Sequence, residues 1–364
     1  MATPRPLRGK RVIEFSQFIA GPTAAQLLAD FGAEVIKIEP PSGDPTRALQ
    51  GNAFGSVYYR SFNTNKTSRV LDMRDARDRQ DFDQLLAEAD ALVSNATPST
   101  LRRLGLDGES LKERHPHLVV TLISGFGQQD DRTCMDTIAQ CESGFAWLNG
   151  TKTGEPRVST SWPVDFFTGL YAGFSTAMAL ADRERAGGLV VDISMMEVAA
   201  AMLLGPAGLL TSEGDTPAPP TGNADRACAP ANVYRCKDGH VYVYGGLDNY
   251  WAKLREMVGG EQSTLMERFA NADHYDALVE RWTLERTRGE VLAAMAEAAI
   301  PAGAVRDPIE AVEIIRALRP GAVTEPLENG EHVPAFPALF SGERIRRRRA
   351  PDRDRRDDRH LRLP

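Results

Sequence analysis

One aspartate stands where an apolar environment would change what a carboxylate can do. Asp165 lies in the segment Trp162-Pro-Val-Asp-Phe-Phe-Thr-Gly169, at the start of a long helical pattern. A carboxylate among aromatic side chains is poorly hydrated, which makes it a stronger nucleophile that can form a covalent intermediate. A proline followed by an acid in the first turn is equally an ordinary helix start. The residues alone therefore leave a catalytic and a structural role for Asp165 open.

The turn Ala20-Gly21-Pro22 joins a short apolar run to a helical pattern and is a second candidate. Ligands of open α/β sheets sit at the carboxyl ends of strands, where a helix N-terminus favours anions. A phosphate-bearing ligand and an ordinary tight turn both remain open here. Neither this turn nor Gly125-Phe-Gly-Gln-Gln-Asp130 follows the Gly-x-Gly-x-x-Gly fingerprint of nicotinamide cofactors, and the Walker A pattern is absent.

Metal and hydrolase chemistry find little support. Of six histidines only His115 and His117 are close in sequence, and we expect them at the surface rather than in a metal site. No Gly-x-Ser-x-Gly elbow occurs. The four cysteines form no Cys-x-x-Cys pair, and the first residues lack the apolar core of a signal peptide. These features predict a reduced, cytoplasmic location without a metal.

The elements that must position Asp165 and the turn Ala20-Gly21-Pro22 are predicted from alternating strand and helix patterns. Apolar runs at 11–15 and 34–38 flank a helical pattern at 24–30, which predicts a βαβ unit and hence a parallel sheet. Further strands are expected at 68–71, 91–94, 118–124 and 189–194, with helices over 77–89 and 163–182 and from Met196. The small and apolar residues of 163–182 predict a buried helix. The fold class is α/β, with an open, doubly wound parallel sheet.

A second, smaller domain is predicted beyond a Pro- and Gly-rich stretch. We assign 1–210 to a large α/β domain, 211–230 to a linker, 231–320 to a small α+β domain, and 321–364 to a return segment with an Arg- and Asp-rich tail. Strands at 232–235 and 240–244 surround the turn Lys237-Asp238-Gly239. Helices are expected at 250–257, 275–282 and 288–298.

Length and charge limit the function classes. A chain of 364 residues with 42% hydrophobic and 26% charged residues fits two globular domains, and no apolar run is long enough to cross a membrane. The net charge is −7, although the segment from Glu343 to Pro364 contains ten arginines and only five acidic residues. We expect Arg346 to Arg349 to lie in a solvated, poorly ordered end rather than a polyanion site. The acidic body argues against nucleic acid as a partner.

An ordered series of motifs makes the chain similar to a known family. The motifs are, in chain order, Leu7-Arg-Gly-Lys-Arg-Val-Ile-Glu-Phe15, Ala20-Gly-Pro22, Ala33-Glu-Val-Ile-Lys-Ile-Glu-Pro40 with Gly43-Asp44 and Arg47, Asn63-Thr-Asn-Lys66, Leu71-Asp72, Arg103-Leu-Gly-Leu-Asp107, Ile123-Ser-Gly-Phe-Gly-Gln128, Asp136 to Gln140 with Ser143-Gly144, Asp165 with Gly169 and Gly173, Val191-Asp-Ile-Ser194 with Glu197, Gly222-Asn223, Asp238-Gly239 and Pro301-Ala-Gly-Ala-Val305. The chain resembles the class III CoA-transferases, which include formyl-CoA and crotonobetaine CoA-transferases and the 2-methylacyl-CoA racemases.

The resemblance implies an interlocked homodimer and a covalent mechanism. Asp165 matches the aspartate that attacks the acyl-CoA thioester, forming an acyl–aspartyl anhydride and then an aspartyl–CoA thioester, from which an acceptor carboxylate takes the CoA. We expect backbone amides between Gln17 and Ala20 to stabilise the oxyanions. Positions matching the family's CoA contacts are Gln17, Phe18, Ala20, Leu71, Met73, Arg74, Asn95 and Arg103. The arginines among them would pair with phosphates.

Two alternatives to CoA transfer remain. The racemases use a histidine where this chain has Met135, and methionine cannot act as a general base. CoA transfer with acyl-CoA and a small carboxylic acid as substrates is therefore favoured over racemase or isomerase chemistry. The third reading is a catalytically silent CoA-binding protein.

Overall fold

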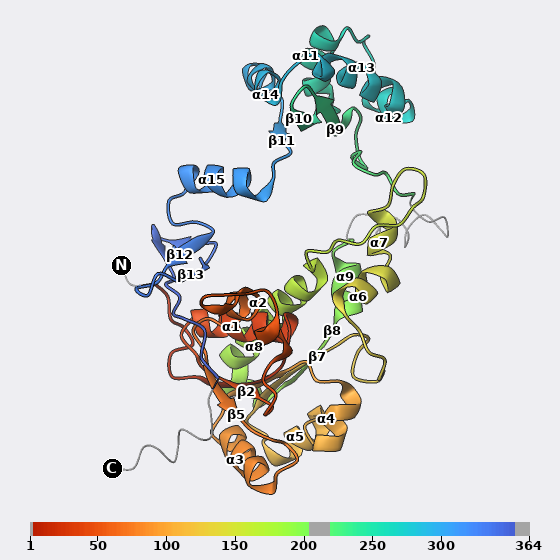
Figure 1. Ribbon diagram of the computed structural model, residues 1–364. Helices are drawn as coiled ribbons and strands as arrows, with labels where there is room; N and C mark the ends of the chain where they lie inside the picture. The colour runs from red at the N-terminus through yellow and green to blue at the C-terminus, as the bar shows by residue number, and fades with distance from the viewer. Residues whose placement is uncertain (1–2, 204–218, 354–364) are drawn as a thin grey trace. The chain divides into compact units, whose positions relative to one another are not determined.

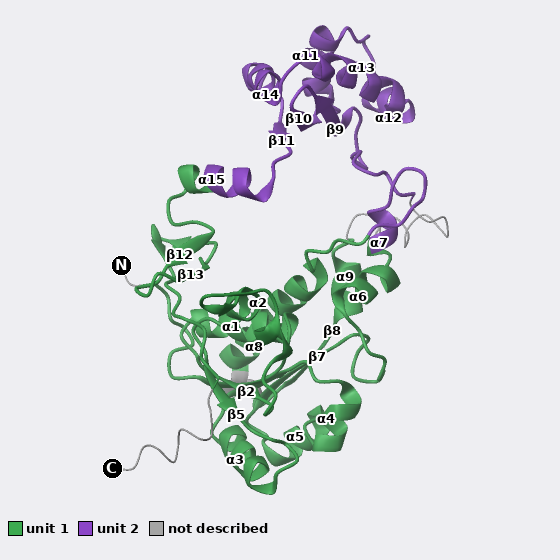
Figure 2. Cartoon of the chain, in the orientation of Figure 1, with its two compact units in different colours: residues 1–145, 158–215, 315–364 green, residues 146–157, 216–314 purple. Residues whose placement is uncertain are grey.

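The structure is a computed structural model that describes residues 3–203 and 219–353. The chain divides into two compact units (Figure 2): unit 1 comprises 1–145, 158–215 and 315–364, and unit 2 comprises 146–157 and 216–314. Residues 211–218 of the expected linker lie outside the described residues.

Unit 1 is built on a six-stranded sheet in which every neighbouring pair is parallel. The strands, in sheet order, are β5 (Thr67–Val70), β2 (Glu34–Glu39), β1 (Arg11–Phe15), β6 (Ala91–Ser94), β7 (Val119–Ser124) and β8 (Val190–Ser194). Taken along the chain this is the order 3-2-1-4-5-6 of doubly wound dinucleotide-binding folds, with its switch point between β1 and β6. The predicted α/β class and parallel sheet are confirmed.

Helices cover both faces of this sheet (Figure 1), which explains why its strands are apolar runs rather than alternating patterns. One face, including Val12 and Val93, packs against α1 (Ala20–Asp30), α6 (Asp136–Glu142), α8 (Pro163–Ala186) and α9 (Met195–Ala201). The other face, including Ile13 and Leu92, packs against α3 (Ala76–Ala87), α4 (Pro98–Leu104) and α5 (Gly108–Arg114).

Helix α8 approaches α1 through two glycines. A Cβ atom on Gly169 would lie 2.5 Å from Thr23 Cβ and 2.8 Å from Ala20 O, and one on Gly173 would lie 3.3 Å from Ala24 O. No larger residue at 169 would allow this approach. The contact places the first turn of α8, and with it Asp165, beside the start of α1.

The prediction that residues 163–182 form a buried helix is wrong for part of the helix. Helix α8 exposes a row of large apolar side chains: Phe166, Phe167, Tyr171, Phe174 and Met178. The described residues of unit 1 leave these side chains exposed. A set of exposed large apolar side chains is typical of a surface that a further packing partner covers.

The C-terminal segment of unit 1 also differs from expectation. It follows α15 (Pro308–Leu318) with the short strands β12 (Thr324–Pro326), β13 (His332–Pro334), β14 (Leu339–Phe340) and β15 (Glu343–Arg344). The Arg347 side chain is only 8% exposed and its Nη2 lies 2.6 Å from Asp30 Oδ2 on α1, while the amide of Arg348 donates to Asn65. The expectation of a solvated end is therefore wrong for Arg347, because a buried carboxylate binds it, whereas Arg346, Arg348 and Arg349 are exposed. Residues 354–364 of the tail lie outside the described residues.

Unit 2 contains the antiparallel sheet β11-β10-β9. Its elements are β9 (Ala231–Cys236), β10 (Gly239–Tyr244), β11 (Ala302–Ala304), α11 (Asp248–Val258), α12 (Leu265–Ala270), α13 (Ala272–Leu284) and α14 (Arg288–Glu297). Trp251, Tyr234 and Val279 lie at the centre of its core. The hairpin around Lys237-Asp238-Gly239 and the helices predicted within 250–298 are confirmed, whereas α12 was not predicted.

The remaining elements are the 3₁₀ helix η1 (Pro45–Ala48), β3 (Gly51–Asn52), β4 (Gly55–Ser56), α2 (Val57–Phe62) and α7 (Phe145–Leu148). Within residues 3–203 and 219–353, no helix combines the length and the apolar character needed to cross a membrane.

Candidate active site

A cavity of about 390 Å³ opens in unit 1 at the carboxyl ends of β1 and β6. It lies at the switch point of the sheet, where doubly wound folds bind their ligands. Its lining comes from the turn after β1, the ends of β2, β6 and β7, the segment before α6 and the first residues of α8 and α9: Phe15, Ser16, Gln17, Phe18, Ala20, Ile38, Pro40, Asn95, Ala96, Thr97, Pro98, Thr100, Ile123, Ser124, Gly125, Arg132, Thr133, Cys134, Met135, Asp165 and Met195.

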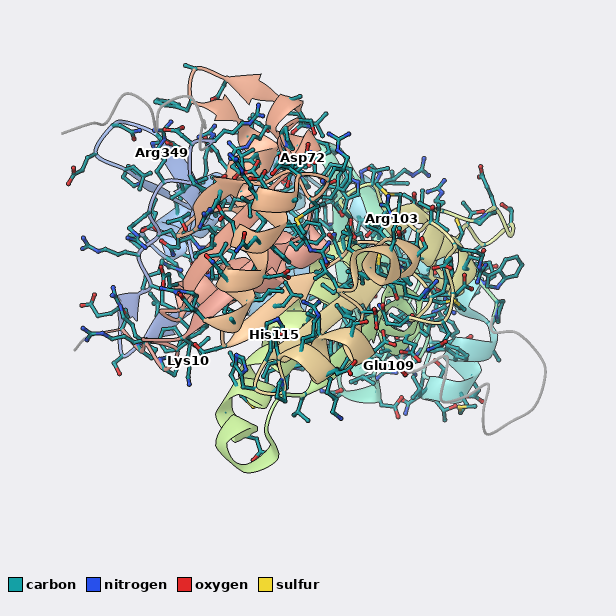
Figure 3. All side chains as sticks on the ribbon, turned by 90° about the horizontal axis from the view of Figure 1, so that it is seen from below. Lys10, Asp72, Arg103, Glu109, His115 and Arg349 are labelled. Carbon is teal, nitrogen blue, oxygen red and sulfur yellow. The ribbon has the colours of Figure 1, made fainter. Side chains whose placement is uncertain are left out.

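Five of the nine predicted site residues line this cavity: Asp165, Gln17, Phe18, Ala20 and Asn95. Leu71 is buried in the core beneath α3, and Met73 packs against the same core. Arg74 is exposed and forms a bidentate pair with Asp72, with both N–O distances 2.9 Å. Arg103 is exposed on α4; Figure 3 views the chain from that side and labels Arg103 and Asp72. The CoA contacts of all eight residues, those that line the cavity included, stay predictions.

The β1–α1 turn (residues 16–19) is held against the end of β6 by a pair of amide hydrogen bonds. The Gln17 N–H donates to Asn95 Oδ1 at 2.9 Å, and Asn95 Nδ2 donates to Gln17 O at 2.7 Å. Phe18 has a φ of 64°, a conformation that costs energy in a residue with a Cβ and persists only when its surroundings impose it. Since the Gln17 N–H already donates to Asn95, only the amides of residues 18–20 are left as predicted donors to an oxyanion.

Helix α1 begins inside this cavity without a side-chain cap. Its first residue, Ala20, lines the cavity, and its N-cap residue Ile19 has no side chain that can accept a hydrogen bond. The first N–H groups of a helix have no partners within the helix and attract negative charge. The start of α1 can therefore stabilise an oxyanion or a phosphate that enters the cavity.

Asp165 occupies the first turn of α8 and faces the same cavity. Its backbone N–H donates to Oδ1 of the buried Asp136 at 2.9 Å, and Asp136 also accepts from Gln140. Burial, together with the negative charge of Asp136, raises the pKa of Asp165 to about 7. No side chain of the described residues donates a hydrogen bond to its carboxylate, so at neutral pH the ionised form is available and poorly solvated.

Two other groups near Asp165, the Cys134 thiol and the Tyr58 phenol, stay neutral at pH 7. Burial raises the pKa of the Cys134 thiol to about 11, with a further contribution from the charge of Asp165. Burial likewise raises the pKa of Tyr58 to about 12, again with help from Asp165. At neutral pH neither supplies an anion, and thiol nucleophiles react as thiolates. Asp165 is therefore the group in this cavity suited to nucleophilic attack.

Within the described residues, no group of three or more His, Cys, Asp or Glu side chains is arranged to hold a metal ion. The cavity combines a reactive carboxylate, a helix start that favours anions, and a lining in which Met135, Met195 and Ile123 are apolar. This arrangement suits attack of the carboxylate on an activated carbonyl carbon, with the developing oxyanion directed at the start of α1.

Sequence reasoning did not assign a role to Asp136 or to the buried lysines Lys37 and Lys66. Asp136 follows a residue in extended conformation and opens a short helix, a pattern too common to single it out. For Lys37 the sequence did contain a signal of a buried charge, because this residue interrupts the apolar strand Glu34–Glu39 of a parallel sheet. A charged residue inside such a strand needs a buried partner.

The pKa of Asp165 predicts a pH-dependent effect on stability. Because the folded-state pKa, about 7, lies above that of an unfolded aspartate, the folded protein binds the extra proton between about pH 4 and 7, and stability falls as the pH rises through this window. We expect Asp165→Asn to be more stable than the wild type at pH 8 by about 1–3 kcal/mol, a range that allows for partial solvent exposure.

Urea unfolding at pH 5 and pH 8 measures this difference, which should shrink at the lower pH. Asp182→Asn, at an exposed site on the same helix, is the matched control and should show no such trend. A wild type as stable as Asp165→Asn at pH 8 would contradict the raised pKa.

Known proteins are similar to this chain in sequence and in fold. The chain is 33% identical to the succinyl-CoA–D-citramalate CoA-transferase of Chloroflexus aurantiacus, over 83% of this chain and 79% of that protein. It is 31% identical to the acetyl-CoA:oxalate CoA-transferase of Acetobacter aceti, over 93% and 90%. A crystal structure of a CaiB/BaiF family protein from Brucella suis is 30% identical, with a TM-score of 0.83 over 96% of this chain and 97% of that one.

The crystal structure of Rv3272 from Mycobacterium tuberculosis, 24% identical with a TM-score of 0.84, covers 97% of this chain and 98% of that one and shows the same fold. The family model described as CoA-transferase family III matches residues 7–356. The chain belongs to CoA-transferase family III.

Proposed function

We propose that this protein transfers CoA from an acyl-CoA thioester to a carboxylic acid through covalent intermediates on Asp165. The observation that carries the proposal is the position of this carboxylate: it faces the cavity at the switch point of the sheet, and burial raises its pKa to about 7. A carboxylate that is ionised but poorly solvated near neutral pH is suited to attack a thioester carbonyl.

The exchange takes place in balanced steps. An Asp165 oxygen attacks the thioester carbonyl, the C–S bond breaks, and CoA leaves as the thiolate while the acyl–aspartyl anhydride forms. The thiolate then attacks the aspartyl carbonyl, releasing the donor acid as a carboxylate and leaving CoA on Asp165 as a thioester. The acceptor carboxylate attacks this thioester, forming a second anhydride and freeing the thiolate. Attack of the thiolate on the acceptor's carbonyl gives the new acyl-CoA and restores Asp165.

Each step passes through a tetrahedral oxyanion, and the proposal assigns its stabilisation to the start of α1. Phe18 and Ala20 line the cavity next to this helix start, and Asn95 fixes the turn through its two bonds to Gln17. Donors held in place before the reaction contribute more than mobile ones, because no reorganisation is needed as charge develops. All eight residues predicted to contact CoA stay predicted contacts: Gln17, Phe18, Ala20, Leu71, Met73, Arg74, Asn95 and Arg103.

Alpha-proton chemistry has weaker support in the same cavity. Met135 stands at the position of the racemases' histidine and lines the cavity with a thioether, which is not a general base. Its neighbour Cys134 has a pKa raised to about 11 by burial and is not a base at neutral pH.

The proposal includes a homodimer whose chains are interlocked. The apolar row on α8, including Phe174 with 65% exposure, needs a cover, and an apolar cavity of about 740 Å³ between α1, α8 and Phe31 adjoins it. A second copy of this chain would bury both features. The reduced, cytoplasmic location predicted from the cysteine pattern is part of the same proposal and stays a prediction.

Covalent labelling tests the mechanism. Incubation with acetyl-CoA and succinyl-CoA, followed by intact-mass analysis, should show an adduct heavier by CoA less one water on the wild type. Asp165→Asn should show none, and its kcat should fall by about 10³-fold or more. Bound CoA, measured by calorimetry, should persist in the variant. Binding without any adduct on the wild type would contradict the proposal for these donors.

Light scattering and subunit exchange test the assembly. The wild type should be a dimer, and two differently tagged preparations should not exchange subunits on mixing, because interlocked chains separate only by unfolding. Phe174→Arg should lower the dimer fraction, whereas Met266→Arg, at a site with 72% exposure on α12, should not. A wild-type monomer or rapid exchange of wild-type subunits would contradict the interlocked dimer.

A further inference from the structure

Four charged side chains lie fully or almost fully buried beneath the β1–α1 turn. Lys37 Nζ is 2.8 Å from Glu14 Oε1 and 3.0 Å from Asp44 Oδ2, and Lys66 Nζ is 2.7 Å from Glu14 Oε2. We call Glu14, Lys37, Asp44 and Lys66 the lysine cluster. It connects β1, β2 and the residues that precede β5 and η1.

Each lysine also binds a main-chain carbonyl beside the cavity. Lys37 Nζ donates to Ser16 O at 2.9 Å, on the N-terminal side of Gln17 and Phe18. Lys66 Nζ donates to Pro22 O at 2.9 Å, in the first turn of α1, and to Asn63 Oδ1 at 2.9 Å. Each ammonium group thus makes three polar contacts, and the two carbonyls lie on either side of the predicted oxyanion donors.

Both lysines are charged at neutral pH. Burial lowers the pKa of Lys66, against the opposing charge of Glu14, to about 8. Burial alone would lower the pKa of Lys37 too, but Glu14 and Asp44 outweigh it and raise the pKa. Burying ammonium groups is costly, and a buried ion pair contributes little net stability compared with apolar packing. The burial of the lysine cluster beneath the turn therefore calls for a role other than stabilising the fold.

The turn itself needs external support. Phe18 is held at a φ of 64°, and a Cβ on Gly21 would lie 2.4 Å from Ser16 Cβ, so the chain folds back tightly here. Strained backbone of this kind stays in one geometry only when its surroundings determine it. The hydrogen bonds of Lys37 and Lys66 to the carbonyl oxygens of Ser16 and Pro22 supply that support.

We propose that Lys37 and Lys66 are positioning residues that hold the β1–α1 turn and the start of α1 in the geometry required for attack by Asp165. The inference rests on the proposed CoA transfer. Neither lysine lines the cavity, and both act through the backbone carbonyls that they bind. A misplacement of about 1 Å in a catalytic group can cost about 10²-fold in rate.

Lys66→Met tests the proposal because it keeps the length of the side chain and removes its donors. Arg60→Met is the matched control: Arg60 is buried, pairs with Glu331 at 2.7 Å, and makes its other hydrogen bonds to Ser56 and Asn52, outside the turn. Amide hydrogen exchange of residues 15–24 should be about tenfold faster in Lys66→Met and unchanged in Arg60→Met.

Single-turnover labelling of Asp165, with whichever of acetyl-CoA and succinyl-CoA labels the wild type, should be about 10²-fold slower in Lys66→Met and within about threefold of wild type in Arg60→Met. Glu14→Gln, which preserves side-chain volume, provides the same comparison if Lys66→Met does not fold, with a decrease of about tenfold in the labelling rate.

Unchanged exchange of residues 15–24 in Lys66→Met would overturn the proposal, as would equal losses of labelling rate in Lys66→Met and Arg60→Met. A wild type that acquires no label would overturn the proposed function and the catalytic part of this inference. Faster exchange together with slower labelling supports both.

Discussion

Two buried ammonium groups beneath the β1–α1 turn constrain the cavity. Lys37 and Lys66 lie between the carboxylate of Glu14 and the carbonyls of Ser16 and Pro22, so the end of β1 and the first turn of α1 share one set of charged hydrogen bonds. Such groups are expensive to bury and costly to leave unpaired, so the turn cannot shift without breaking several of these contacts. The start of α1, which we propose stabilises the oxyanion, is thereby held in position relative to the sheet.

Close packing of α8 on α1 supplies the second half of the site. The absence of side chains at Gly169 and Gly173 lets the two helices approach, and the first turn of α8 then brings Asp165 to the cavity. The same burial that positions this carboxylate removes much of its hydration and, with Asp136 beside it, raises its pKa to about 7. Position and reactivity thus have a common origin in the packing of one helix pair.

Much of the fold was predictable because its signals are local. Strands such as 11–15 and 91–94 are apolar runs, and their parallel pairing follows from the helices between them. Asp165 was singled out as a candidate through its apolar neighbours and the family motifs, and it lines the cavity. Three features were not predicted: the lysine cluster, the ion pair of Arg347 with Asp30, and the exposed apolar side chains of α8. Each depends on contacts between residues that are distant in the sequence. A sequence pattern alone does not distinguish a helix that its own chain covers from one whose large apolar side chains stay exposed.

The covalent role of Asp165 is tested most directly by following oxygen rather than mass adducts. If the acceptor carboxylate attacks an aspartyl thioester, one of its oxygens must remain on Asp165 after each turnover. Turnover with acceptor acid labelled with ¹⁸O, followed by digestion and mass analysis of the peptide that contains Asp165, should show the label in that carboxylate. Continued turnover with an unlabelled Asp165 peptide would contradict the covalent mechanism.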